Sequence, residues 1–512
     1  MSKAERGWVW GFSVMAMLLT SLPYAIALLS APHTFTGFLI GVEDGNAYIA
    51  QMQQGAAGAW LFRSVYSTLP QQGALLYLPY LLLGKLLGSQ ASHLSFVLAF
   101  HAFRLISLAA VCHAVYAFVS EFVSNVSLRR VGLALVVFGG GLGWLVLLFG
   151  RSELYGSLPL DFYSPETFGF LAAFSLPHLV LSRALLLYAL VLVLRGQAGG
   201  WRFVALWLVL ALVHLLTAAL GSVLLAVFVV LAWLHRTPSW QATLRASMLA
   251  LTGAAVPLAY NGWVYLHDAY LQGWAAQNLI LAPHPLHYVL AYGWLLPLAY
   301  LGWRSAAGAA RVLSAGWLLA LPVLLYLPLG LQRRFAEGVW VLLLALALRG
   351  LQNMPPVRTR RFVVMLVLLA APSTLLLWLG ALNGALHPAA PAFRNADEVA
   401  LFSSLQDVPG ATVLAAYSSG NAAPAWAPVR VVIGHGPETV GLDELSAQVD
   451  YFYNRGTLDT ERTAFLHQHN VQFVLWGPAE RVHSRGWVPE LAEYLLPYSE
   501  YGNFQLFRVQ LP

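Results

Sequence analysis

The chain has 512 residues, of which 59% are hydrophobic and only 10% are charged. Soluble proteins carry about 25% charged residues, so this composition predicts a polytopic membrane protein. The formal net charge of +6 is small for the length, and no basic stripe or nucleic-acid motif indicates a nucleic-acid partner. Cys112 is the single cysteine, which excludes an intrachain disulfide framework and a cysteine-based metal site.

The first apolar run, over about residues 8–29, follows Lys3 and Arg6. No A-x-A-like cleavage site follows it, so we expect a retained membrane span rather than a removed signal peptide. The more polar residues 30–72 form the first loop, in which 48–60 are expected to be a helix on the membrane surface.

The next apolar run, residues 74–88, is interrupted by Pro79 and carries Lys85. About 20 residues are needed to cross a bilayer, so we expect a re-entrant or juxtamembrane helix here. The remaining apolar segments bring the number of crossings to about 11. They are 93–119, 132–149, 170–194, two short helices in 202–235 that turn near 214–221, 247–266, 288–303, 312–329, 337–348 and 362–382.

With about 11 crossings, the basic clusters between spans, such as Arg129-Arg130 and Arg360-Arg361, fall on the side of the N-terminus. The positive-inside rule makes that side cytoplasmic. Counting 74–88 as a crossing would scatter these clusters over both sides. We therefore expect a bacterial cytoplasmic-membrane protein with its N-terminus inside and its C-terminal residues outside.

The residues after about 386 are more polar and alternate between strand-like and helix-like stretches, which predicts a small α/β domain. The strands are expected at 412–416, 429–433, 471–476 and 504–509, and the helices at 396–405, 443–453 and 460–469. The predicted organisation is thus a transmembrane domain over 1–385 and an extracytoplasmic domain over 386–512.

Glu43 and Asp44 lie directly after the first span. Charge is costly near a bilayer, so an acidic pair in this position is a functional candidate. The alternative is a solvated loop or a helix N-cap. The second candidate is Arg333-Arg334, which falls on the predicted external side against the positive-inside rule. An ion pair between Arg333 and Glu337, four residues on, is the structural alternative.

Other polar residues gather on the same predicted side, and each has a plain alternative as a solvated loop residue, a cap or a satisfied interior side chain. They are Asp161, Glu166, His178, His214, Gln277, Asn278 and His284. In the C-terminal domain, His435 and Glu438 lie in the segment 434–439 and could help bind an acceptor. A loop stabilised by glycine and proline turns is the alternative for that segment.

A carboxylate can act as general base on an acceptor hydroxyl, and arginine recognises phosphate, often bidentately. No nucleotide sugar is expected outside the cytoplasm, so a lipid-linked donor is the natural sugar source there. The combination predicts an inverting displacement at the sugar C1, with the polyprenyl phosphate leaving against arginine.

The stretch Glu43-Asp44-Gly45-Asn46-Ala47-Tyr48 resembles the first external loop of the GT-C superfamily of membrane glycosyltransferases, which includes protein O-mannosyltransferases and the lipid A aminoarabinose transferase. By this resemblance Asp44 matches the catalytic aspartate and Tyr48 the tyrosine that often follows it. A second acidic residue in the next external loop is a family trait, and either Asp161 or Glu166 fits.

The Glu-Asp order departs from the Asp-Glu or Asp-Asp that is common in the family, which leaves the division of roles between Glu43 and Asp44 open. The signature W-W-D-x-G is absent, so the oligosaccharyltransferase branch is not expected. Some GT-C enzymes use a divalent ion. The spacing here forms no metal motif and no metal is predicted; Asp44, Glu166 and His178 are the ligands if one binds.

Two other functions stay open: a transporter or flippase for a lipid-linked glycan, and a non-enzymatic protein of cell-envelope assembly. A transporter would place polar groups along a midplane path, whereas here they gather on one side. The favoured partners are a polyprenyl-phosphate-linked sugar, the lipid bilayer and a glycan, lipid or protein acceptor.

Overall fold

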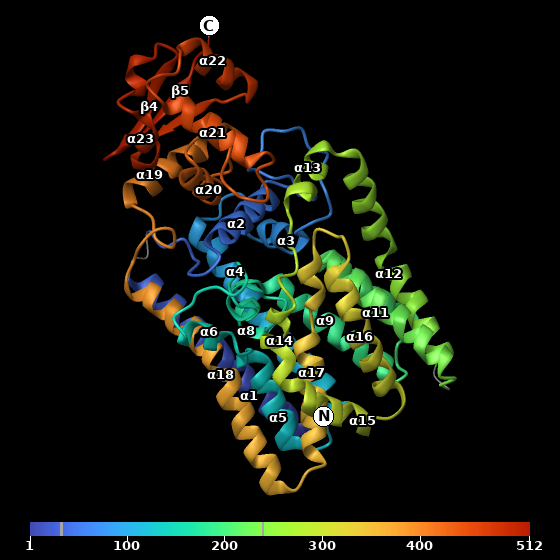
Figure 1. Cartoon of the computed structure of the whole chain (residues 1–512). Helices are drawn as coiled ribbons and strands as arrows, with labels where there is room; N and C mark the ends of the chain where they lie inside the picture. The colour runs from blue at the N-terminus through green and yellow to red at the C-terminus, as the bar shows by residue number, and fades with distance from the viewer. Residues whose placement is uncertain (31–33, 238–239, 512) are drawn as a thin grey trace. The chain divides into compact units, whose positions relative to one another are not determined.

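The computed structural model describes residues 1–30, 34–237 and 240–511; residues 31–33 of the predicted first loop lie outside this description. The chain divides into two compact units (Figure 1). Unit 1 comprises Met1–Pro23, His101–Tyr260 and Leu279–Asn383, and unit 2 comprises Tyr24–Phe100, Asn261–Asn278 and Gly384–Pro512.

Eight of the described helices are long and apolar enough to cross a membrane. They are α1 (Lys3–Ser30), α4 (His93–Ser120), α9 (Pro177–Leu194), α11 (Leu215–Leu234), α12 (Trp240–His267), α16 (Gly308–Tyr326), η2 with α17 (Gln332–Gln352) and α18 (Pro356–Leu386). With the small C-terminal sheet described below, they confirm the predicted class, a helical polytopic membrane protein with an α/β domain.

The other three predicted spans are shorter or interrupted helices. α5 (Val126–Phe138) and α6 (Gly143–Leu148) are separated by a glycine-rich bend, and α10 (Gly200–Val213) ends where His214 adopts an extended backbone. The third comprises α14 (Leu286–Tyr292), η1 (Gly293–Leu295) and α15 (Leu296–Ser305). Each interruption brings polar backbone and side chains into unit 1.

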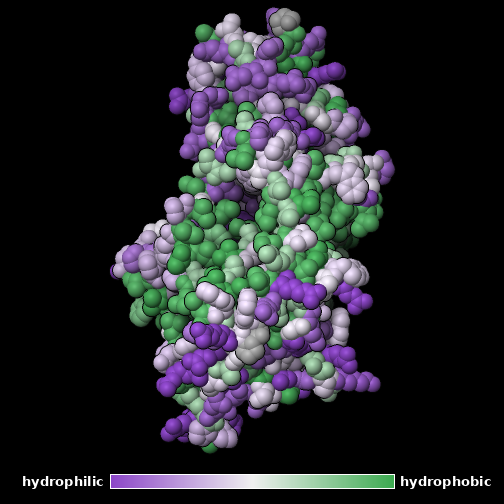
Figure 2. All heavy atoms as spheres, turned by 90° about the vertical axis from the view of Figure 1, so that its right-hand side faces the viewer, coloured by the Kyte–Doolittle hydropathy of each residue, from purple (hydrophilic) through white to green (hydrophobic). Residues whose placement is uncertain are grey.

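Unit 1 is built around α17 (Val339–Gln352), in which nearly every residue is buried. α15 packs directly on it, because the backbone of Gly302 lies against the carbonyl group of Leu346. The outer helices are apolar on their exposed faces: Leu251, Val256 and Leu266 of α12 are largely exposed. Figure 2 shows hydrophobic side chains over much of this face of the helical part, as expected for contact with lipid.

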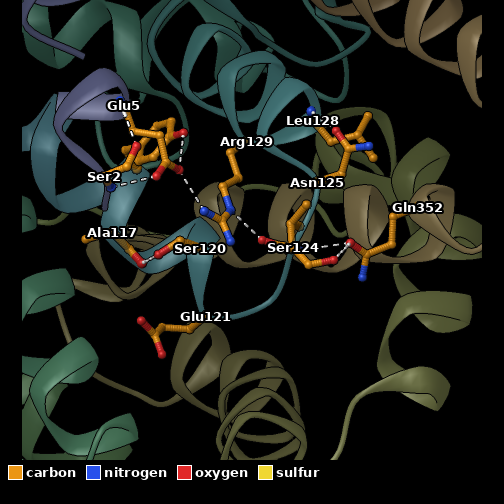
Figure 3. A network of polar contacts seen from close by, with 12 residues as sticks. Ser2, Glu5, Ala117, Ser120, Glu121, Ser124, Asn125, Leu128, Arg129 and Gln352 are labelled. Atoms are coloured by element: carbon orange, nitrogen blue, oxygen red, sulfur yellow. Dashed lines mark hydrogen bonds and ion pairs between the residues drawn. The ribbon is translucent and has the colours of Figure 1, made fainter. Parts of the chain in front are cut away.

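A polar network ties α1, α4 and α5 together (Figure 3). The Glu5 carboxylate accepts hydrogen bonds from Arg129 Nη1 at 2.7 Å and from the Tyr116 hydroxyl at 2.9 Å. Arg129 also donates to the carbonyl group of Val123. Glu5 is buried, so the ion pair with Arg129 and the tyrosine bond compensate for its desolvation.

In unit 2, α2 (Val42–Ala56) packs backbone to backbone against α3 (Leu78–Leu87). Gly55 lies against the carbonyl group of Leu81 and Gly84 against that of Met52, so neither position has room for a Cβ atom. α3 has 10 residues, about 15 Å of helix, half of what a bilayer requires. This length agrees with the predicted juxtamembrane helix at 74–88.

The C-terminal part of unit 2 holds a five-stranded sheet of order β2-β1-β3-β5-β4. β1 (Thr412–Leu414) pairs in parallel with β2 (Arg430–Val431) and β3 (Phe473–Trp476), and β5 (Phe504–Val509) pairs antiparallel with β3 and β4 (Leu495–Tyr501). The helices are α19 (Ala396–Ser404), α20 (Tyr417–Trp426), α21 (Leu442–Tyr453), α22 (Asp459–Gln468) and α23 (Pro478–Ser484).

Four of these strands and helices α19, α21 and α22 lie where the sequence predicts them. The sequence analysis missed β4, α20 and α23. β4 is an edge strand with mostly exposed side chains and Pro497, which hides the strand pattern. α20 contains Gly420, Asn421 and Pro424, all poor helix formers, and forms a helix because its buried face packs on α2 and on the sheet.

The first loop and the C-terminal sheet belong to the same unit. α20 lies beside α2 (Figure 1), and Asn46 donates to the side-chain oxygen of Asn421 at 2.8 Å. Tyr66 donates its hydroxyl to the carbonyl group of Asn421, and the carbonyl group of Val65 accepts from the amide of Val431 at the sheet edge. The C-terminal domain therefore packs directly against the residues of the first loop.

Candidate functional site

The acid pair occupies the first turn of α2. Gly41 caps this helix in the left-handed conformation, with φ near +65°, which glycine adopts without steric cost. Glu43 and Asp44 therefore follow the cap, and neither is the cap itself, which was one of the alternatives. Negative charge is stabilised at a helix N-terminus by the helix dipole.

Both acids contact side chains of the C-terminal domain. The Tyr417 hydroxyl donates to Glu43 Oε2 at 3.0 Å, and His435 Nε2 lies 3.3 Å from Asp44 Oδ1. The Asp44 side chain is 56% exposed, whereas that of His435 is 6% exposed. The buried imidazole of His435 thus orients the Asp44 carboxylate, which is still accessible to a substrate.

The loop that carries His435 is fixed by neighbours from two other segments. Gln277, at the end of α13 (Ala269–Gln277), donates to the carbonyl groups of Pro437 and Thr439 at 2.9 and 2.7 Å. The Tyr270 hydroxyl donates to the carbonyl group of Glu438. Gln277 therefore bridges backbone carbonyl groups of this loop.

Glu438 is buried, and its carboxylate accepts from Ser64 Oγ at 2.7 Å. Burial raises the pKa of Glu438 above its usual value, against the opposing effects of His435 and Ser64. Burial alone would lower the pKa of His435, but the hydrogen bond to Asp44 and the negative charge of Glu438 outweigh it, so the net pKa is raised. The imidazole thus favours the form that donates to Asp44.

Two further predicted residues of unit 2 lie outside this contact set. Tyr48 is buried and stacks on Tyr80 with ring centroids 4.4 Å apart, close to Phe100. Asn278 ends α13 through its backbone amide. Tyr48 consequently packs α2 against α3.

In unit 1, Arg333 and Arg334 lie on η2 (Gln332–Ala336) and both face Glu166. Arg333 Nε is 3.9 Å and Arg334 Nε 3.6 Å from the Glu166 carboxylate, too long for hydrogen bonds. Both Nε atoms are buried and have no hydrogen-bond partner among the described residues. The Arg333 guanidinium also lies 4.5 Å from the ring centre of Tyr163. The cluster therefore has donors to spare for an anion.

Glu337 forms an ion pair with Arg183. The alternative considered for Arg333, an ion pair with Glu337, is therefore wrong. Arg183 Nε and Nη2 both donate to its carboxylate, in a bidentate pair that is almost fully buried. The same guanidinium donates to the carbonyl groups of Pro165 and Phe168. The Arg183–Glu337 pair thus fixes the segment that carries Glu166. It also engages Glu337, so that Glu166 is the acid that faces the two arginines of η2 in the described structure.

The two acidic residues after span 3 occupy different surroundings. Glu166 faces the arginines, whereas Asp161, on α7 (Leu160–Tyr163), is inserted into the bend between α5 and α6. A Cβ atom at Gly140 or Gly143 would collide with the Asp161 carboxyl group. Burial raises the pKa of Asp161 to about 6, against the stabilising effect of Ser373 and the amides of the bend.

Asp161 should make the stability of the protein depend on pH. Its pKa is higher in the folded state, so folding favours the protonated carboxyl group. The contribution of Asp161 to the free energy of unfolding is therefore fully present below about pH 4 and is lost as the pH rises through 6. At pH 7.5 the free energy of unfolding of Asp161→Asn should therefore exceed that of the wild type by up to ~3 kcal/mol, which thermal unfolding measures as a higher midpoint temperature. Near pH 4 the two proteins should have the same stability. Glu153→Gln, an exposed acid of the same loop, is the control; an Asp161→Asn curve parallel to the wild type would contradict the prediction.

The three predicted histidines of unit 1 lie in different surroundings. His214 lies at the break between α10 and α11, with Nδ1 2.7 Å from Thr217 Oγ1 and Nε2 3.5 Å from Arg334 Nη1. The ring of His178 is 5.8 Å from that of His214. His284 is exposed and stacks on Tyr155. His214 thus contacts Arg334 directly, and His284 is a surface residue.

The sequence analysis missed four contributors: Arg183, Tyr163, Tyr417 and Ser64. A signal existed for Arg183, because a charged residue inside an apolar span is a functional or structural candidate in itself. The others have no unusual feature in the sequence and gain their roles from contacts with other segments. No metal-binding group of three His, Cys, Asp or Glu side chains occurs among the residues described.

No protein-family model matches this sequence, and no curated protein is significantly similar to it. Solved structures do match over nearly the whole chain. ArnT from Cupriavidus metallidurans in the apo state has a TM-score of 0.57 at 13% identity, with 99% of this chain and 98% of ArnT covered. ArnT bound to undecaprenyl phosphate has a TM-score of 0.53 at 12% identity, with 98% of each chain covered.

The archaeal oligosaccharyltransferase AglB from Archaeoglobus fulgidus, in complex with an inhibitory peptide and a dolichol-phosphate, has a TM-score of 0.54 at 13% identity. The match covers 98% of this chain and 75% of AglB. The chain therefore has the GT-C fold of these membrane glycosyltransferases, which confirms at the level of the fold the resemblance seen in the first loop.

Proposed function

We propose that the protein is an inverting glycosyltransferase that moves a sugar from a polyprenyl-phosphate carrier to an extracytoplasmic acceptor. The fold supports this proposal, because two proteins that share it bind undecaprenyl phosphate and dolichol-phosphate. The observation that carries it is Asp44, a half-exposed carboxylate at a helix N-terminus that a buried histidine orients.

The role of base fits Asp44 better than Glu43. Asp44 Oδ1 contacts His435, and the Asp44 side chain is 56% exposed, so an acceptor hydroxyl can approach it. In the proposed step the acceptor proton passes to Asp44 while the acceptor oxygen forms a bond to the sugar C1. The bond between C1 and the phosphate oxygen breaks, and the polyprenyl phosphate leaves with the electron pair. Glu43, held by Tyr417, supports the turn.

Arg333 and Arg334 are proposed to hold the phosphate of the carrier. Three arginines and two glutamates make this cluster net positive: Arg183, Arg333 and Arg334 against Glu166 and Glu337. The free Nε donors of the two η2 arginines suit an anionic phosphate oxygen. By this proposal Glu166, rather than Asp161, is the acid of the phosphate-binding cluster, because it faces the two guanidinium groups.

The orientation proposed for the chain follows the charge distribution. The N-terminus and the basic loops lie in the cytoplasm, and the C-terminal domain lies outside the cytoplasmic membrane. An external site favours a lipid-linked donor, which the membrane itself delivers. No divalent ion is assigned a role in this scheme.

Binding of undecaprenyl phosphate tests the donor site. The wild type in nanodiscs should bind this lipid, and Arg333→Gln with Arg334→Gln should weaken binding about 100-fold or more, because each of the two lost charged hydrogen bonds is worth roughly 1.5–3 kcal/mol. The matched control replaces Arg360 and Arg361, an exposed pair at the start of α18, by glutamine. Equal affinity of both double variants would show that η2 does not hold the phosphate.

A further inference from the structure

The loop of residues 434–439, like Tyr417, brings the C-terminal domain into contact with the acid pair. It follows β2 directly, and its residue His435 is the side chain that meets Asp44. The ring of His435 is 5.4 Å from that of Tyr66, at a tilt of 32°. A histidine from the last quarter of the chain thus reaches a carboxylate of the first loop.

This loop is held in one conformation from several directions. Within it, Thr439 Oγ1 accepts from the amides of Gly434 and His435, and the Thr439 amide donates to the His435 carbonyl group. Thr439 Oγ1 also donates to the carbonyl group of Tyr66. Gln277 and Tyr270 bind the far side of the loop. The position of the imidazole is therefore fixed before any substrate arrives.

The hydrogen bonding of the imidazole is directed at Asp44. Nδ1 is buried and has no hydrogen-bond partner among the residues described, so the contact to Asp44 is made through Nε2. An imidazolium and a neutral ring protonated at Nε2 both donate there. The buried Glu438, three residues on, places negative charge behind the ring and favours a proton on it.

We propose that His435 is a positioning residue that holds the Asp44 carboxylate for proton abstraction, so that the C-terminal domain completes the active site. The inference rests on the proposed glycosyl transfer. His435 Nε2 contacts Oδ1 of a carboxylate that is 56% exposed and so open to an acceptor hydroxyl. Without this bond the carboxylate loses the orientation that the buried imidazole gives it, and fewer encounters with the acceptor are productive.

The chain offers a matched control. His469 also belongs to the C-terminal domain and also contacts the first loop, with Nδ1 3.0 Å from Thr68 Oγ1. It has no contact with Glu43 or Asp44 in the described structure. Loss of His469 removes a link of the same kind between the domain and the loop and leaves the acid pair untouched.

The test compares His435→Gln with His435→Asn. The amide nitrogen of glutamine reaches the position of Nε2, whereas that of asparagine reaches only the position of Nδ1. Steady-state transfer from an undecaprenyl-phosphate-linked sugar should show kcat reduced about 100-fold in His435→Asn, with the donor KM changed less than about threefold. His435→Gln should recover most of the loss, and His469→Asn should retain wild-type kcat. Thermal unfolding of each variant reports the folded fraction to which rates are normalised.

Two results would overturn the inference. If His435→Gln is as impaired as His435→Asn at equal folded fraction, the Nε2 donor is not what matters. If His469→Asn loses kcat equally, the effect belongs to the general link between domain and loop. If the wild type transfers no sugar from any lipid-linked donor, the proposed function itself fails, which is a separate outcome that the wild-type assay shows at once.

Discussion

Replacement of Asp44 by asparagine is expected to lower sugar transfer about 10²- to 10⁴-fold, the range for loss of a positioned general base. Asparagine keeps the size and the acceptor oxygen that His435 contacts, so the fold of unit 2 should be retained. It cannot take the proton of the acceptor hydroxyl. The measurement is product formation from undecaprenyl-phosphate-linked sugars by purified protein, normalised to the folded fraction.

Glu43→Gln is the matched control for this prediction. Glu43 lies in the same helical turn and is exposed, but its carboxylate is engaged by the Tyr417 hydroxyl. Its loss should cost much less activity than that of Asp44. The Asp44→Asn protein should still bind undecaprenyl phosphate, because the phosphate is assigned to η2. An Asp44→Asn variant with wild-type transfer would remove the proposed base and would favour a transporter or assembly role.

Much of the fold follows from composition and hydropathy. The positions of all predicted spans correspond to helices, because an apolar run in a bilayer has few alternatives to a helix. What the sequence did not show is where helices break. The bend at Gly139–Leu142 exists because Asp161 fills it, and the break at His214 brings that ring to Arg334. Both depend on a partner far along the chain.

The sequence alone also revealed only part of the candidate site. Glu43, Asp44, Arg333 and Arg334 are unusual in the sequence alone, since charge beside a span is costly and arginine is rare on the side predicted to be external. The residues that contact them have no unusual feature in the sequence. Tyr417 is 374 residues from Glu43, and His435 is 391 residues from Asp44, so only the folded chain connects them.

Replacement of Glu337 by glutamine is expected to be among the most destabilising single changes in unit 1. It leaves the buried Arg183 guanidinium without its bidentate partner, at a cost of about 3–5 kcal/mol. The free energy of unfolding in detergent micelles measures the effect. Glu121→Gln, which breaks the more exposed pair with Arg195, is the control and should cost about 0–1 kcal/mol. Equal stability of the two variants would contradict the prediction.

The double variant Arg183→Met/Glu337→Leu separates stability from site geometry. Two apolar side chains remove both buried charges, so most of the lost stability should return. The carbonyl groups of Pro165 and Phe168 still lose the donors that Arg183 supplied. Glu166 lies between these two residues, and it faces Arg333 and Arg334. The double variant should therefore fold well and still bind undecaprenyl phosphate more weakly than the wild type; wild-type affinity would show that the arginine pair is positioned without help from this segment.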